Sequence, residues 1–137
     1  MTKYLRISGS SALPDISQMA PYRAVLVVEE KVTPEWRAMV SGWLIKSGCL
    51  YMLAWGDECS KWDDSVDIAN LEEFDYREIP DEASIMTTWH ESEPLEEVFQ
   101  FAKAFAFHPH LDLNQTLILH IAESDKQAEF LRMYDSA

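Results

Sequence analysis

The sequence has few of the residues that build phosphate-binding loops or disulfide frameworks. It contains four glycines and two cysteines in 137 residues. Loops that cradle a phosphate depend on clustered glycines, and neither GxGxxG nor GxxxxGKS/T occurs in the chain. The two cysteines, Cys49 in an apolar run and Cys59 in a polar segment, do not make a disulfide framework. We therefore expect no cofactor and a reducing, cytoplasmic location.

The chain is also short of positive charge and of long apolar runs. Eleven Lys and Arg residues stand against 24 Asp and Glu residues, which gives a net charge of −13. Such a field repels phosphate backbones and anionic lipid headgroups, so neither nucleic acid nor membrane is an expected partner. No run approaches the ~20 apolar residues that span a bilayer, and the first residues lack the apolar core of a signal peptide.

Length and composition fit one domain. The chain is 47% apolar and 12% aromatic, well above the content of sequences that stay disordered. Residues 1–20 hold a short extended-looking piece followed by serines, a glycine and a proline, which predicts an N-terminal arm or loop. Residues 21–137 are predicted to form a single α/β domain.

A strand, a helix and a second strand open this domain. Residues 23–28 and 49–55 are continuous apolar runs, typical of strands covered on both faces. Between them, Thr33 and Pro34 supply a capping side chain and a proline at the first helical position, and Gly48 ends the helix. This spacing predicts a right-handed crossover between parallel strands.

Helices and strands continue to alternate downstream. Residues 65–74 predict a helix capped by Asp63 or Asp64, and residues 84–89 and 116–122 predict strands. A capping box at residues 124–127 opens a last helix. The helix that starts at Pro94 has the apolar stripe Leu95, Val98, Phe99, Ala102, Phe105 and Ala106.

The whole pattern predicts a three-layer domain. It comprises a four-stranded, mainly parallel sheet with helices on both faces, resembling a small flavodoxin-like or Rossmann-like fold. In such sheets ligands bind beyond the carboxyl ends of the strands. Acidic and aromatic side chains follow several of the predicted strands, so this edge is where we expect a site.

Residues 55–65 are the densest part of this edge, with two tryptophans, four acids and a thiol. One interpretation is structural: Trp55 and Trp62 cover the sheet edge while Asp63 and Asp64 cap a helix. The other is a binding surface in which aromatic side chains and carboxylates orient a partner. The candidate binding residues are Trp55, Asp57, Trp62, Asp63, Asp64 and Trp89.

His90 is the leading candidate for acid–base chemistry, with Glu91 and Cys59 beside it in the predicted site. Histidine titrates near neutral pH, and a neighbouring carboxylate can tune it. Carboxylates around Cys59 favour its thiol form. His120 lies within an apolar strand and is interpreted as a buried, hydrogen-bonded histidine. Hard oxygen ligands for Mg²⁺ or Ca²⁺ could come from Glu30, Asp57, Asp63 and Glu91.

Two segments resemble a known family. Residues 55–74 read WGDECSKWDDSVDIANLEEF, which matches the pattern WGxxCSxWDDSVDxANLEEF, and residues 86–91 read MTTWHE. Together with residues 23–30 and 47–56 they resemble a family of short bacterial proteins of unknown function. This family carries no known activity, so the resemblance implies only a bacterial stand-alone domain and transfers no functional residue.

Fifteen of the 24 carboxylates lie in residues 57–97, against Lys61 and Arg77. This stretch is either a solvated face or a docking surface. The leading hypothesis is an interaction protein of the inhibitor, immunity or antitoxin kind that docks a basic protein. An alternative is a small metal-assisted hydrolase-like enzyme with His90 as base, and a second is a small-molecule sensor.

Overall fold

The computed structural model describes residues 1–9 and 11–137. The described strands form one parallel sheet of five strands, in the order β1-β5-β2-β3-β4. Read from β2, the order reverses, because β3 and β4 lie on one side of it and β5 and β1 on the other. The strands are β1 (Thr2–Ile7), β2 (Tyr22–Val28), β3 (Cys49–Gly56), β4 (Met86–His90) and β5 (Gln115–Ile121).

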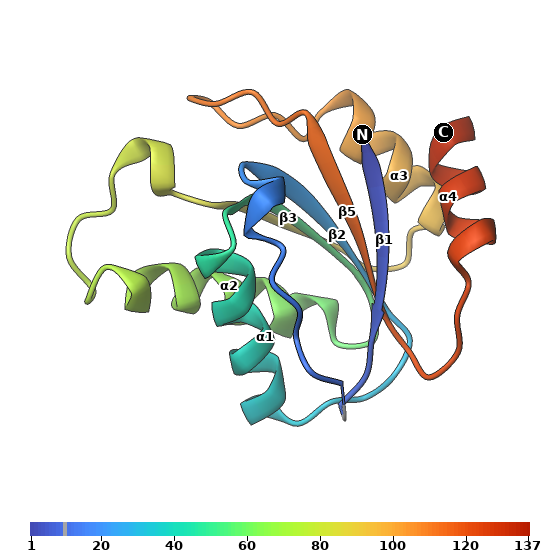
Figure 1. Ribbon diagram of the computed structural model, residues 1–137, viewed down its shortest axis with the longest axis horizontal. Coiled ribbons are helices and arrows are strands. Elements are labelled where there is room, and N and C mark those ends of the chain that lie inside the picture. The colour runs from blue at the N-terminus through green and yellow to red at the C-terminus, as the bar shows by residue number, and fades with distance from the viewer. Residues whose placement is uncertain (10) are drawn as a thin grey trace.

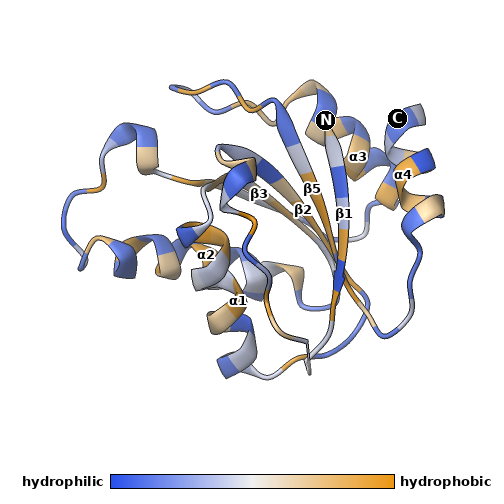
Figure 2. Ribbon diagram, viewed as in Figure 1, coloured by the Kyte–Doolittle hydropathy of each residue, from blue (hydrophilic) through white to orange (hydrophobic). Residues whose placement is uncertain are grey.

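Helices cover both faces of this sheet, as predicted (Figure 1). Helices α1 (Pro34–Lys46) and α2 (Cys59–Glu73) pack side by side on one face. Helices α3 (Leu95–Ala104) and α4 (Gln127–Ser136) cover the other, and short 3-10 turns occupy Ser17–Met19 and Asp81–Ala83. Figure 2 shows apolar residues concentrated along the central strands. The three-layer α/β architecture is therefore confirmed.

The predicted number of four strands was wrong, because Thr2–Ile7 forms a fifth. This segment pairs in parallel with β5, from Thr2 opposite Thr116 to Ile7 opposite Ile121. Its inward side chains, Tyr4 and Ile7, are buried. The other positions are polar or partly exposed, as expected for an edge strand, so the run lacks the continuous apolar pattern of the central strands.

Two helix boundaries also differ from the prediction. Helix α2 begins at Cys59, after Glu58 in a left-handed conformation (φ 52°), so Asp63 and Asp64 lie inside the helix and do not cap it. Helix α4 begins at Gln127 without the predicted capping box; instead, the Gln127 amide donates to Asp125 Oδ1 at 2.8 Å. The predicted cap of α1 is confirmed, since Thr33 Oγ1 accepts from the Trp36 amide at 3.1 Å.

The carboxyl ends of all five strands lie at one edge of the sheet because every pairing is parallel. Backbone hydrogen bonds tie the loops of this edge together: the Glu29 amide donates to Ile121 O at 3.0 Å, and the Asp57 amide to Val28 O at 2.9 Å. The loops that follow β2, β3 and β5 are therefore neighbours, as the crossover topology predicts. No helix within the described residues has the length and apolar character needed to cross a membrane.

Candidate functional site

Cations surround the acids that follow β3. Lys31 Nζ lies 3.3 Å from Asp57 Oδ1, and Glu58 accepts from Lys61 at 3.2 Å and from Arg37 at 3.4 Å. The hydrogen bond from Lys61 and the charges of all three cations hold the pKa of Glu58 below its usual range. Asp57 and Glu58 are therefore neutralised by cations of the same chain, and they offer little net charge to a basic partner.

A buried histidine occupies the point where the strand order reverses. His120 is fully buried, and its ring nitrogens bond the Tyr4 hydroxyl at 2.7 Å and Glu29 at 2.5 Å. Lys126 Nζ lies 3.3 Å from the second oxygen of Glu29. Burial raises the pKa of Glu29, but the hydrogen bonds from His120 and Lys126 outweigh it and leave the pKa lowered. The predicted buried, hydrogen-bonded histidine is confirmed, and these contacts join the ends of β1, β2 and β5.

His90 is also buried and held on both sides of its ring. Its Nε2 bonds Thr88 Oγ1 at 2.9 Å, and its Nδ1 lies 3.2 Å from Glu93. A carboxylate, an imidazole and a hydroxyl in this order can act as a general-base relay. The Thr88 hydroxyl is, however, also hydrogen-bonded to Tyr51, and the His90 ring packs against Phe101 with centroids 5.0 Å apart. These contacts fix β4 against β3 and α3.

The other two candidates for catalysis are placed differently. Cys59 is buried at the start of α2, where burial and then the charge of Glu91 raise the pKa of its thiol. The thiol therefore stays protonated near neutral pH and is a poor nucleophile. Glu91 is exposed, directly after β4.

The tryptophans of residues 55–65 face the interior. Trp62 is 0% exposed and meets Trp36 edge to face, with ring centroids 6.3 Å apart. Trp55 is partly buried, and its Nε1 donates to Glu93 O at 2.6 Å. Trp89, by contrast, is 51% exposed on β4. Of the three candidate binding tryptophans, Trp89 has by far the most surface to offer a partner.

Asp63 and Asp67, one turn apart on α2, form a carboxyl pair beside β4. Thr87 Oγ1 donates to Asp67 Oδ1 at 2.9 Å. Burial, followed by the charge of Asp67, raises the pKa of Asp63, and burial likewise raises the pKa of Asp67. Asp63 Oδ2 is buried without a hydrogen-bond partner, and two carboxylates at this spacing repel one another. The pair costs stability once both groups are ionised.

Asp63→Asn should therefore raise the free energy of unfolding by about 1 kcal/mol at pH 7. The pKa of Asp63 is higher in the folded than in the unfolded chain, so its unfavourable contribution appears as pH rises above its ordinary value of 3.8 and persists at neutral pH. Urea unfolding at pH 7 and at about pH 3, where the carboxyl is protonated in both states, measures the difference. The control is Asp64→Asn, at an exposed neighbouring position. An equal increase in the free energy of unfolding from both variants would contradict the repulsion between Asp63 and Asp67.

The predicted metal ligands do not converge. In the parts of the chain that the structure describes, no group of three or more His, Cys, Asp or Glu side chains could hold a metal ion. Asp57 pairs with Lys31 and Asp63 with Asp67, while Glu91 is exposed after β4. Glu30 lies in the loop after β2.

Exposed apolar side chains border β4, and sequence reasoning missed most of them. Phe105 was predicted to face inward, but α3 ends at Ala104, which leaves Phe105 68% exposed. The segment after α3 is tied to β4, because His108 Nε2 bonds Ser84 O at 2.8 Å and Phe101 joins His90 to Phe105 through ring contacts. We call the exposed side chains on β4 and on this segment the aromatic edge; they are Met86, Trp89, Phe105 and Phe107.

These contacts define a three-layer α/β protein with an exposed apolar border along one edge of its sheet. The chain belongs to a family described as a domain of unknown function (DUF7684), which matches residues 2–137. The predicted membership of a family of unknown function is thereby confirmed. No curated protein and no solved structure gives a significant match.

Proposed function

We propose that this chain is a protein-interaction domain of the inhibitor, immunity or antitoxin kind, which binds a basic segment of a partner protein along β4. The observation that carries the proposal is the exposure of Trp89 and Met86 on an edge strand that contains no charged residue. An edge strand presents backbone N–H and C=O groups that can pair with an added strand.

The two edges of the sheet differ in how they are protected. Strand β1, at one edge, carries Lys3 and Arg6, and charges of this kind discourage pairing with another chain. Strand β4 reads Met-Thr-Thr-Trp-His and has neither lysine, arginine nor proline. A strand added to β4 would therefore meet no such barrier.

Side chains of the aromatic edge lie on both faces of β4. Thr87 contacts α2 through Asp67, so Trp89, two residues on, projects to the same face. His90 projects to the opposite face, where its ring contacts Phe101, and Phe101 in turn contacts Phe105. A segment laid along β4 would contact Trp89 on one side and Phe105 on the other, and aromatic anchors of this kind dominate binding energies.

Exposed carboxylates follow β4 in the chain. They are Glu91, directly after the strand, and Glu96 and Glu97 in the first turn of α3. Arginine satisfies both features, since its guanidinium stacks on aromatic rings and pairs with carboxylates. An extended segment containing arginine is the chemistry that suits this edge best. The hydrolase alternative is weaker, because its proposed acids do not converge on His90.

Trp89→Ala should weaken binding of the partner by about 30-fold or more, the loss expected when an interface anchor is truncated. The partner is identified by affinity capture from the native host and mass spectrometry, and the affinity of the purified pair is measured by calorimetry. Binding should also weaken as salt rises, because opposite charges steer the encounter.

The matched control is Met39→Ala, since Met39 is 52% exposed but lies on α1, away from β4. Its affinity should stay within about twofold of the wild type, as expected outside a binding hot spot. A partner that binds Trp89→Ala and the wild type equally would overturn the proposal. So would a partner whose bound segment is acidic.

A further inference from the structure

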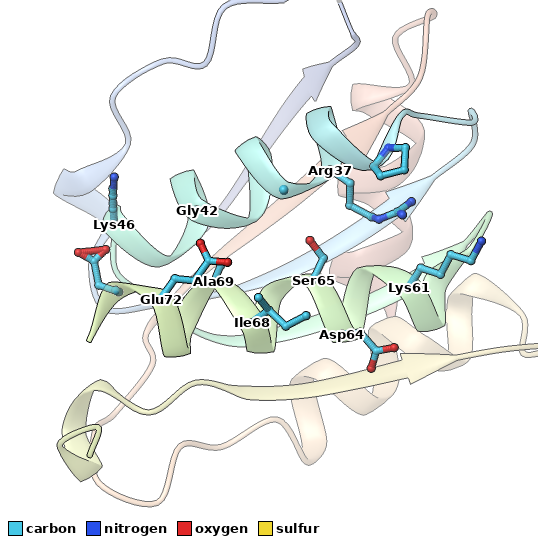
Figure 3. Close-up of a pocket in the computed structure, with 12 residues that line it drawn as sticks. Arg37, Gly42, Lys46, Lys61, Asp64, Ser65, Ile68, Ala69 and Glu72 are labelled. Atoms are coloured by element: carbon cyan, nitrogen blue, oxygen red, sulfur yellow. The ribbon is translucent and has the colours of Figure 1, made fainter. Parts of the chain in front are cut away.

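We propose that a second copy of this chain docks on the groove between α1 and α2. The groove has a volume of about 560 Å³ and runs along the outer face of the two helices (Figure 3). Small residues from both helices line it, including Ala38 and Gly42 of α1 and Ser65 and Ala69 of α2. This proposal concerns the α1–α2 layer and goes beyond the proposed binding at β4.

The side chains that line the groove carry no net charge, whereas the whole chain is strongly acidic. Its lining contains three basic side chains, Arg37, Lys46 and Lys61, and three acidic ones, Asp64, Glu72 and Glu73. The net charge of −13 therefore belongs to the rest of the chain. Two copies repel one another over most of their surfaces, and this face is where they can approach without that cost.

The charges are unevenly distributed between the two walls. Arg37 and Lys46 lie on α1, whereas all three acids lie on α2 together with Lys61, and Figure 3 shows Lys46 and Glu72 near the same end of the groove. Both helices lead from the carboxyl ends of parallel strands back to the amino ends, so they run in the same direction. A two-fold axis parallel to them places α1 of one copy over α2 of the other, without reversing either helix.

This symmetry brings opposite charges together at the carboxyl-terminal ends of the helices, while at the other end Arg37 and Lys61 are each paired with Glu58 of their own copy. Lys46 of one copy then lies over the end of α2 that carries Glu72 in the second copy, and the reciprocal pair forms across the axis. An axis perpendicular to the helices would instead stack α1 on α1 and bring basic side chains together. Charge complementarity thus selects a second copy in one orientation.

The surface offers apolar contact and close approach as well. Ile68, in the lining, is exposed, and so is Met39 on α1. A Cβ added at Gly42 would have open space within 4 Å, so the backbone of α1 is uncovered at this point. Small residues of this kind let helices approach to roughly 8 Å between axes.

Sedimentation analysis of a charge-reversed pair tests the proposal. Lys46→Glu alone faces two acid–acid contacts in the proposed dimer, and Glu72→Lys alone faces two base–base contacts. Each should dimerise at least about tenfold more weakly than the wild type, because like charges facing each other across an interface are costly. In an equimolar mixture both contacts become pairs of opposite charge, so the heterodimer should form with near wild-type affinity.

Recovery of dimerisation in the mixture distinguishes the α1–α2 interface from any other dimer interface. Both residues are exposed, so neither variant should lose its fold, which circular dichroism checks. A wild-type chain that stays monomeric up to millimolar concentration would overturn the proposal. A dimer that survives both single variants, or a mixture that stays as weak as its components, would overturn it too. Binding of the basic partner at β4 is measured separately and does not depend on this result.

Discussion

Replacing Trp62 with alanine is expected to lower the free energy of unfolding by about 3 to 5 kcal/mol, the cost of removing a large aromatic side chain from a core. Trp62 is 0% exposed and fills the space between α1, α2 and the sheet, where it contacts Trp36. Neither helix can collapse far enough to fill a void of that size, because both are also anchored on the strands. Urea denaturation followed by circular dichroism measures the loss.

Trp89→Ala is the matched control, because it removes the same side chain from an exposed position. Its cost should stay below about 1 kcal/mol, as for most surface substitutions. Similar losses from the two variants would mean that Trp62 is not the core residue described above. Since whole domains are stable by only about 5 to 15 kcal/mol, the Trp62 variant should be close to unfolding at 37 °C.

Gly56→Ala is expected to be the second most damaging single substitution, at about 2 kcal/mol or more. Gly56 ends β3 with φ at 102°, a conformation that side chains rarely adopt. A Cβ at this position would also collide with the carbonyl oxygen of Val28 on the neighbouring strand. The strand cannot yield, because Val28 O accepts the hydrogen bond from the Asp57 amide that holds the loop after β3.

Gly42→Ala provides the contrast, since Gly42 lies inside α1 with open space around it. Alanine there should stabilise the chain by about 0.5 to 1 kcal/mol, the difference in helix propensity. Thermal unfolding of both variants measures the two shifts. A Gly56→Ala chain that melts at the wild-type temperature would contradict the close approach of β2 and β3.

The central part of the fold could be predicted because its pattern is strong and local. The runs that became β2 and β3 are continuously apolar, and the Thr33–Pro34 start of α1 is set by one side-chain cap and one proline. The start of α2 could not be predicted in the same way. Glu58 adopts a left-handed conformation without a capping side chain, so no local sequence signal marks the start of this helix.

The candidate site was harder to predict because exposure depends on tertiary contacts. Trp62 and Trp89 both follow polar residues, yet one is fully buried under α1 and the other projects from the sheet edge. Phe105 continued a helical stripe in the sequence, and only the end of α3 at Ala104 turns it outward. The register of one helix and the end of another decided which aromatic residues a partner could reach.

The pairing of β1 with β5 has a consequence for synthesis on the ribosome. Thr2 lies opposite Thr116, so the first strand to be made can find its neighbour only after most of the chain has been translated. Until then Tyr4 and Ile7 have nothing to cover them, and contacts so distant in sequence form slowly. Strand β1 therefore has to wait for β5, so this edge of the sheet forms after β2 and β3 can already have paired.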